Sequence, residues 1–148
     1  MPTINITNLT SKFKINGKIA EELILSVLMA EKYDAKEISL ILADDEYVNR
    51  LKLQYFDEDV YTDTITFNLN DEEEAVEGEM YLSADSISQN AQELNIKLDR
   101  ECANVIIHSV LHLLGYEDDN PEQQQIMFDL QEKYLDQFDY DGILTREV

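Results

Sequence analysis

The sequence of 148 residues contains very little cysteine, proline, glycine and histidine. Its single cysteine, Cys102, cannot form an internal disulfide bond, which is typical of proteins in a reducing compartment and favours a cytoplasmic location. Two prolines and four glycines leave no sign of a linker or a low-complexity segment. We therefore expect one domain over residues 1–148, a length that can build its own hydrophobic core.

Long apolar runs and basic residues are also scarce. Residues 19–30 form the most apolar stretch near the N-terminus, but they include two glutamates and are too few to span a bilayer. No secretory signal and no membrane partner is therefore expected. Lysine and arginine number 11 against 32 acidic residues, giving a net charge of −21. This charge favours solubility and disfavours DNA or other non-specific nucleic-acid binding, which depends on basic side chains, so an RNA-binding role would need a local basic site.

The order of apolar patterns predicts a small α+β domain. Alternating or β-branched segments predict strands at residues 3–7, 37–43, 63–69 and 79–82. Helical spacing predicts helices at 17–32, 45–55, 84–94, 100–114 and 121–138, with the N-caps of the last four at Asp44 or Asp45, Ser83, Asp99 and Asn120. Residues 70–79 are expected to form an acidic loop, and residues 139–148 a turn. The predicted fold is a mixed four-stranded β-sheet packed with about five helices.

The only two histidines, His108 and His112, lie four residues apart in the apolar segment 100–114. A helix that is apolar on nearly every side is buried, and its one polar stripe here contains Asn104, His108 and His112. Residues at this spacing lie about 5–6 Å apart, so both imidazoles could bind one metal ion, as in zinc proteases. The alternative is two core histidines that each bond to a neighbour, but a single metal ion would satisfy both rings.

A carboxylate after this helix can complete a metal site. Gly115 is expected to end the helix in a left-handed conformation, so that Glu117, Asp118 and Asp119 are the next side chains able to reach the ion. Two histidines, one carboxylate and an open position are typical of catalytic zinc. Zinc peptidases also have the HxxxH spacing, but Ser109 replaces the glutamate that serves them as general base.

The segment HSVLHLLGYED, residues 108–118, resembles the signature HGxLHLxGYDH of the YbeY family, the bacterial rRNA maturation endoribonucleases. Two further segments, TDTITF at 62–67 and GEMYLS at 78–83, are similar to that family's strands TDVLSF and GDIxIS. There are two main departures. Asp118 replaces the third zinc-binding histidine, and Phe56 stands where the family usually has a functionally important arginine.

The resemblance implies a single-strand-specific, metal-dependent endoribonuclease in small-subunit rRNA maturation and ribosome quality control. It implies one Zn²⁺ ion held by His108, His112 and Asp118, which together form the catalytic centre, with single-stranded RNA and the small ribosomal subunit and its proteins as partners. The expected RNA-binding residues are Arg50, Lys52, Lys97, Arg100 and Tyr116. The four basic side chains could equally be solvated, and Tyr116 could equally pack against the helix end.

Two other functions stay open at this point. One is a non-catalytic ribosome-assembly factor whose metal locks the helix end; the acidic surface, which would attract basic ribosomal proteins, and Phe56 favour it. The other is a zinc hydrolase with a different substrate. Chelation and substitution of His112 would distinguish the enzyme from the assembly factor.

Overall fold

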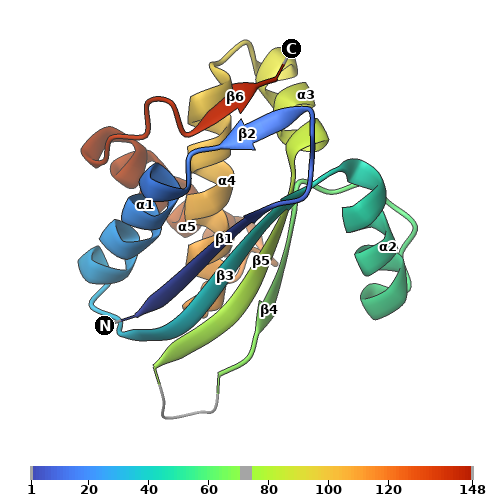
Figure 1. The fold of residues 1–148 in the computed structure, drawn as a ribbon. Coiled ribbons are helices and arrows are strands. Elements are labelled where there is room, and N and C mark those ends of the chain that lie inside the picture. The colour runs from blue at the N-terminus through green and yellow to red at the C-terminus, as the bar shows by residue number, and fades with distance from the viewer. Residues whose placement is uncertain (1, 71–74, 148) are drawn as a thin grey trace.

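The chain forms five helices and six strands over the residues that the computed structural model describes, 2–70 and 75–147 (Figure 1). In chain order these are β1 (Thr3–Asn8), β2 (Phe13–Ile15), α1 (Gly17–Ala30), β3 (Ala35–Ala43), α2 (Asp45–Phe56), β4 (Thr64–Asn68), β5 (Val76–Ser83), α3 (Ala84–Leu94), α4 (Leu98–Leu113), α5 (Pro121–Gln137) and β6 (Leu144–Arg146).

The main sheet has the strand order β1-β3-β5-β4. β3 runs parallel to β1 and to β5, whereas β4 is antiparallel to β5. The prediction of a mixed four-stranded sheet with about five helices is therefore confirmed. The main core lies between one face of this sheet and α1 and α4, while α2 packs on the other face beside β4 and β5 (Figure 1).

Helix α4 lies at the centre of the core, as its apolar sequence predicts. It packs against α1, α3, α5 and the strands β4 and β5. Its C-terminal end comes very close to β5, because a Cβ atom on Gly78 would lie only 2.6 Å from Cδ2 of Leu113. Only glycine fits this approach, which brings the end of α4 beside the β4–β5 edge of the sheet. Among the described residues, no helix is long and apolar enough to cross a membrane.

Three of the four predicted N-caps are confirmed. The side chains of Asp44, Ser83 and Asn120 each accept a hydrogen bond from the backbone N–H three residues later. The prediction for Asp99 was wrong, since α4 begins at Leu98 and has no side-chain cap. The carboxylate of Asp99 instead accepts the backbone N–H groups of Gly142 at 3.0 Å and Leu144 at 3.4 Å, and so ties the C-terminal segment to α4.

Two loop predictions also need correction. The C-terminal turn contains β6, which pairs antiparallel with β2 in a small second sheet. Each of these strands has three residues, too few to show an alternating pattern. Of the predicted acidic loop, residues 76–79 belong to β5, and residues 71–74 lie outside the described residues.

Candidate metal centre

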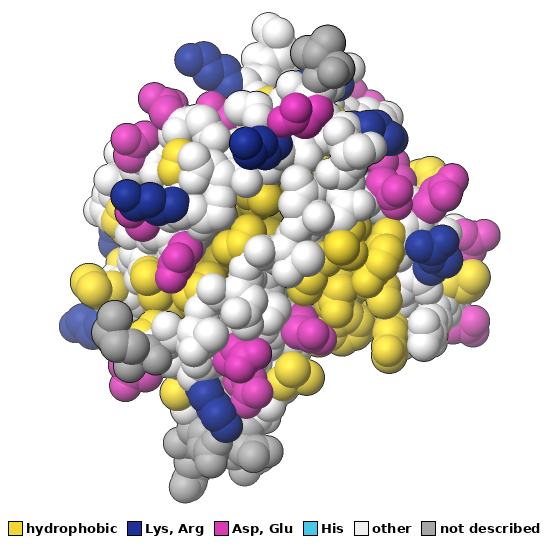
Figure 2. Space-filling model, viewed as in Figure 1, with side chains coloured by type: hydrophobic (Ala, Val, Ile, Leu, Met, Phe, Trp, Pro, Cys, Tyr) yellow, Lys and Arg dark blue, Asp and Glu magenta, His cyan; other side chains and the backbone are white. Residues whose placement is uncertain are grey.

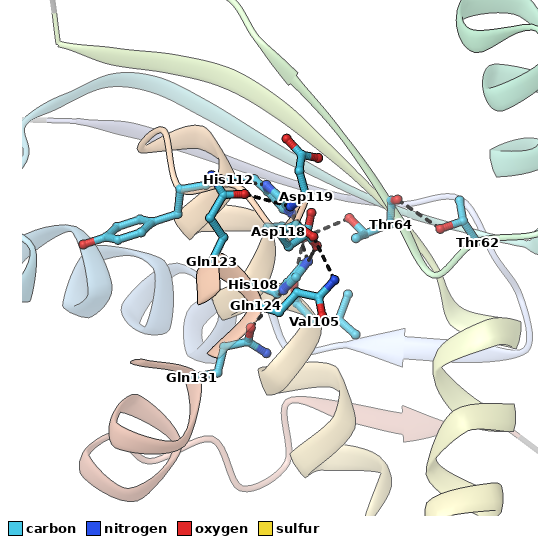
Figure 3. A network of polar contacts seen from close by, with 12 residues as sticks. Thr62, Thr64, Val105, His108, His112, Asp118, Asp119, Gln123, Gln124 and Gln131 are labelled. Carbon is cyan, nitrogen blue, oxygen red and sulfur yellow. Dashed lines mark hydrogen bonds and ion pairs between the residues drawn. The ribbon is translucent and has the colours of Figure 1, made fainter. Parts of the chain in front are cut away.

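His108 and His112 on α4 converge with Asp118 at one point (Figure 3). The Nε2 atoms of the two histidines lie 3.0 Å apart, and Oδ2 of Asp118 lies 3.6 Å from the first and 3.5 Å from the second. In a tetrahedral zinc site with bonds of about 2.0–2.1 Å, the ligand atoms lie roughly 3.3–3.4 Å apart. The spacing of these three side chains therefore fits one bound ion.

The hydrogen bonds of the other ring nitrogens determine the tautomer of both histidines. Nδ1 of His112 donates to the backbone carbonyl of Tyr116 at 2.9 Å, and Nδ1 of His108 donates to the side-chain carbonyl of Gln131 at 2.9 Å. In neutral rings, Nδ1 therefore carries the proton and Nε2 presents a lone pair. Two lone pairs and the Asp118 carboxylate then face one another, so a cation between them would remove their repulsion.

The orientation of the Gln131 amide follows from the bonds behind it. Nε2 of Gln131 donates to Oδ1 of Asn104 at 2.8 Å, and Nδ2 of Asn104 donates to Oε1 of Glu101 at 3.4 Å. Glu101 is only 5% exposed, and burial raises its pKa above the usual glutamate range. The Glu101 oxygen accepts from the Asn104 amide nitrogen, so the Asn104 oxygen is left to accept from the Gln131 amide nitrogen. The carbonyl oxygen of Gln131 therefore faces His108.

The turn after α4 brings Asp118 to the histidines. Gly115 has a φ of +101°, which confirms the left-handed helix end that its position predicts. The first turn of α5 then holds the loop: Nε2 of Gln124 donates to the Asp118 carbonyl at 3.0 Å, and Oε1 of Gln123 accepts the N–H of Asp119 at 2.9 Å (Figure 3). Of the three expected carboxylates, Asp118 alone joins the histidine cluster among the described residues.

The three side chains lie in a pocket of about 400 Å³ between α4, β4 and α2. Lys52, Phe56 and residues 62–66 also line it. Ser109 does not line this pocket. Its side chain is fully buried and donates a hydrogen bond to the Val105 carbonyl at 2.7 Å. Its Oγ also lies 2.8 Å from Oγ1 of Thr64, a contact that holds β4 against α4 beside His108.

Comparison with known proteins identifies the family of this chain. The family model described as Endoribonuclease YbeY matches residues 5–139. The chain belongs to the YbeY family. A protein named Endoribonuclease YbeY from Chloroherpeton thalassium is 40% identical over 109 residues, which are 74% of this chain and 77% of that protein. One from Amoebophilus asiaticus is 35% identical over 130 residues, 86% of this chain and 88% of that protein.

A solved structure supports the fold of this YbeY family member. The solution structure of a Thermotoga maritima protein matches it with a TM-score of 0.65 and 28% sequence identity. The match covers 90% of this chain and 87% of that chain. The resemblance inferred from the histidine segment is therefore confirmed at the level of family and fold.

Asp63 is the residue of this YbeY family site that sequence reasoning missed as a functional candidate. It lines the pocket together with His108, His112 and Asp118 and accepts a hydrogen bond from Nδ2 of Asn90 at 3.4 Å. Burial raises the pKa of Asp63, although nearby His108 opposes this shift. A carboxyl group with a raised pKa beside a metal pocket is suited to proton transfer. Its place in the segment 62–67 was the only available signal.

The structure brings Lys52, of the five expected RNA-binding residues, into the pocket. Its Nζ lies 4.6 Å from the ring centre of Phe56 and 3.7 Å from the carboxylate of Glu58. Arg50 is exposed on the same helix, with its guanidinium 5.8 Å from the ring centre of Tyr47. Lys52 is therefore the one expected RNA-binding residue that lines the pocket of the histidine cluster, and its ammonium is paired with Glu58.

The other three expected residues, like Arg50, do not line this pocket. Lys97 and Arg100 lie at the N-terminal end of α4, where Arg100 pairs with Glu132 at 3.0 Å. The hydroxyl of Tyr116 donates to Oε1 of Glu31 at 2.6 Å, which raises the pKa of Tyr116 to about 12. The ring of Tyr116 is partly buried and packs against the main core.

Proposed function

We propose that this protein is a metal-dependent endoribonuclease that cleaves single-stranded RNA at a Zn²⁺ ion held by His108, His112 and Asp118. Membership in the YbeY family supports the endoribonuclease activity. The observation that carries the metal assignment is the convergence of two Nε2 lone pairs and one carboxylate oxygen. The mixed nitrogen and oxygen donor set suits zinc.

The chain's own residues account for how such a centre is prepared. A bound divalent cation supplies Lewis-acid polarisation of a phosphodiester and makes water more acidic. Gln131 and the Tyr116 carbonyl keep the Nε2 atoms of both histidines free to bind it. Asp118 adds a negative charge where the family signature has a neutral imidazole, so the centre should be less electrophilic than one with three histidines.

Two further side chains can act on the substrate. Asp63, with its raised pKa, can accept or return a proton inside the pocket. Lys52 is the only lysine or arginine among the described residues that line this pocket, and its ammonium can bind a phosphate oxygen of the strand. Single-stranded regions of small-subunit rRNA, reached on ribosomal particles in the cytoplasm, are the substrate that the resemblance of residues 108–118 supports.

The test uses purified protein and a 5′-labelled single-stranded RNA, with the same sequence as a duplex for comparison. We expect cleavage of the single strand that stops with chelator, returns when zinc is added, and is lost in His112→Ala. Wild-type protein should retain about one zinc ion per chain. The control Asp119→Ala removes an exposed neighbouring carboxylate outside the cluster and should keep both metal and activity.

Three results would count against this function. Wild-type protein loaded with zinc that leaves every single-stranded RNA intact would contradict the endoribonuclease. Cleavage that survives both chelation and His112→Ala would contradict the metal centre. Zinc-loaded protein that binds ribosomal particles equally well with and without His112→Ala, and never cleaves their RNA, would favour the assembly factor instead.

A further inference from the structure

Five aromatic side chains form a continuous surface that begins at the metal pocket. We call it the aromatic surface; it consists of Tyr47, Tyr55, Phe56, Phe67 and Tyr81. Phe67 is central: its ring centre lies 6.0 Å from that of Phe56, 5.1 Å from that of Tyr55 and 5.8 Å from that of Tyr81. The ring centre of Tyr81 lies 6.3 Å from that of Tyr47. Figure 2 shows hydrophobic side chains gathered over the sheet beside α2.

The register of β4 and β5 explains why these rings gather. Ile65 lies opposite Tyr81, and Phe67 lies opposite Glu79, so these side chains point to the face of the sheet away from α4. Helix α2 covers part of this face through Val48 but leaves the rings at its C-terminal end exposed. A contiguous exposed apolar surface of this kind is a common mark of a binding site.

The exposed part of the aromatic surface lies at its pocket end. Tyr55 is 59% exposed and Phe56 is 44% exposed. Phe56 belongs to both regions, because it also lines the metal pocket. Lys52 lines the same pocket and sits over the Phe56 ring. A strand with one phosphodiester at the metal centre can therefore continue directly onto the rings.

The charge of the molecule indicates what kind of contact this surface can make. The chain carries a net charge of −21, and Glu79 lies on the same face as the rings. Among the described residues, Arg50 and Lys52 are the only basic side chains that contact rings of the aromatic surface. Phosphate contacts can therefore supply little affinity. Stacking of unpaired bases on aromatic rings is worth about 1–3 kcal/mol per base and requires no positive charge.

We propose that the aromatic surface binds unpaired nucleobases of the RNA strand whose backbone enters the metal pocket. The identity of this ligand rests on the proposed ribonuclease function. The strand is recognised through its bases, with Arg50 and Lys52 as the few cations near its phosphates. Bases within a duplex are hidden from such rings, so the surface also selects single-stranded RNA.

Binding is measured separately from cleavage by fluorescence anisotropy, with a labelled oligoadenylate in the presence of chelator. A strand with the same phosphates but abasic sugars serves as the comparison probe. We expect the abasic strand to bind at least about 10-fold more weakly, because it cannot stack. For single strands, each phosphate contact adds about −0.7 to the slope of log affinity against log salt concentration. With two cations the slope should be no steeper than about −1.4, so binding should depend only weakly on salt.

Substitutions of Tyr55 test the surface directly. Tyr55→Ala should weaken binding of oligoadenylate about 5- to 150-fold, while Tyr55→Trp, which keeps a stacking ring, should not weaken it. Tyr55→Leu keeps apolar packing and removes the ring, so it should also weaken binding. The matched control is Tyr33→Ala, which removes a 47% exposed ring from the segment between α1 and β3, outside the aromatic surface, and should bind normally.

The proposal is overturned by wild-type affinity in both Tyr55→Ala and Tyr55→Leu, or by equal binding of the abasic strand. It is also overturned if Tyr55→Leu dissociates a dimer in sedimentation and leaves RNA binding unchanged, since the surface would then join two copies of the chain. Base-dependent binding by a wild-type protein that never cleaves RNA with zinc present would contradict the ribonuclease function while leaving this binding surface intact.

Discussion

The side-chain carbonyl of Gln131 lies 2.9 Å from Nδ1 of His108 and joins helix α5 to the candidate metal centre. Gln131 in turn donates to Asn104, one turn before His108 on α4. The amide therefore holds the imidazole in the tautomer that presents Nε2 to the Asp118 side. Groups of this kind behind a metal ligand orient it and strengthen the binding of the ion.

Gln131→Leu should weaken zinc binding about 10- to 100-fold, because the His108 ring loses the acceptor that fixes its tautomer. Gln131→Glu keeps an acceptor and should retain much tighter binding than the leucine variant. Competition with a chromophoric zinc chelator measures both. Gln125→Leu, at an exposed position of the same helix, is the control. If Gln131→Leu and Gln125→Leu bind zinc equally well, the contact has no such role.

Asp118→His would restore the third imidazole of the family signature. A neutral ligand leaves more positive charge on the metal, so RNA cleavage by the zinc-loaded variant should be faster than in wild type. Asp118→Ala removes a ligand and should reduce both zinc content and cleavage. Rates are compared at saturating zinc on the same single-stranded RNA. A histidine variant that holds zinc but cleaves more slowly than wild type would show that the carboxylate is better suited to this pocket.

Asp63→Asn should reduce the cleavage rate about 10²- to 10⁴-fold, the range typical of a lost proton-transfer group. Zinc content should not change, since Asp63 is outside the cluster of three ligands. The asparagine variant should also be at least as stable as wild type near neutral pH, because burial disfavours the charged carboxylate. Unchanged cleavage in this variant would exclude Asp63 from proton transfer.

The buried carboxyl of Glu101 predicts a pH dependence of folding stability. Burial raises the pKa of Glu101, so the folded state binds this proton more tightly than the unfolded state. The stabilisation is present below the ordinary glutamate pKa and is lost as pH rises through the raised value. Glu101→Gln lacks this titration, and its stability relative to wild type should increase from about pH 4 to pH 7. Urea unfolding with chelator at several pH values measures it; a constant difference would contradict the prediction.

The parts of this protein that the sequence predicts well are those set by neighbouring residues. His108, His112 and Asp118 lie on one helix and the turn that follows, so helical spacing and Gly115 suffice to bring them together. The caps at Asp44, Ser83 and Asn120 act over three residues and were predicted for the same reason.

Features that depend on distant segments were missed. The pairing of β2 with β6 joins three-residue strands from opposite ends of the chain, with Phe13 opposite Arg146. The Asp99 carboxylate does not cap α4, because it accepts the backbone N–H groups of Gly142 and Leu144 from the C-terminal segment instead. Asp63 and Gln131 reach the candidate metal centre only because β4 and α5 pack beside α4, and no local pattern contains that information.

The most direct test of the metal centre is X-ray absorption at the zinc edge of the zinc-loaded protein. The account predicts nitrogen and oxygen neighbours at about 2.0–2.2 Å, scattering from two imidazole rings, and no sulfur near about 2.3 Å. His112→Ala should lose one ring from that signal. Zinc that carries no imidazole signal, or a protein that binds no zinc at all, would contradict the proposed centre.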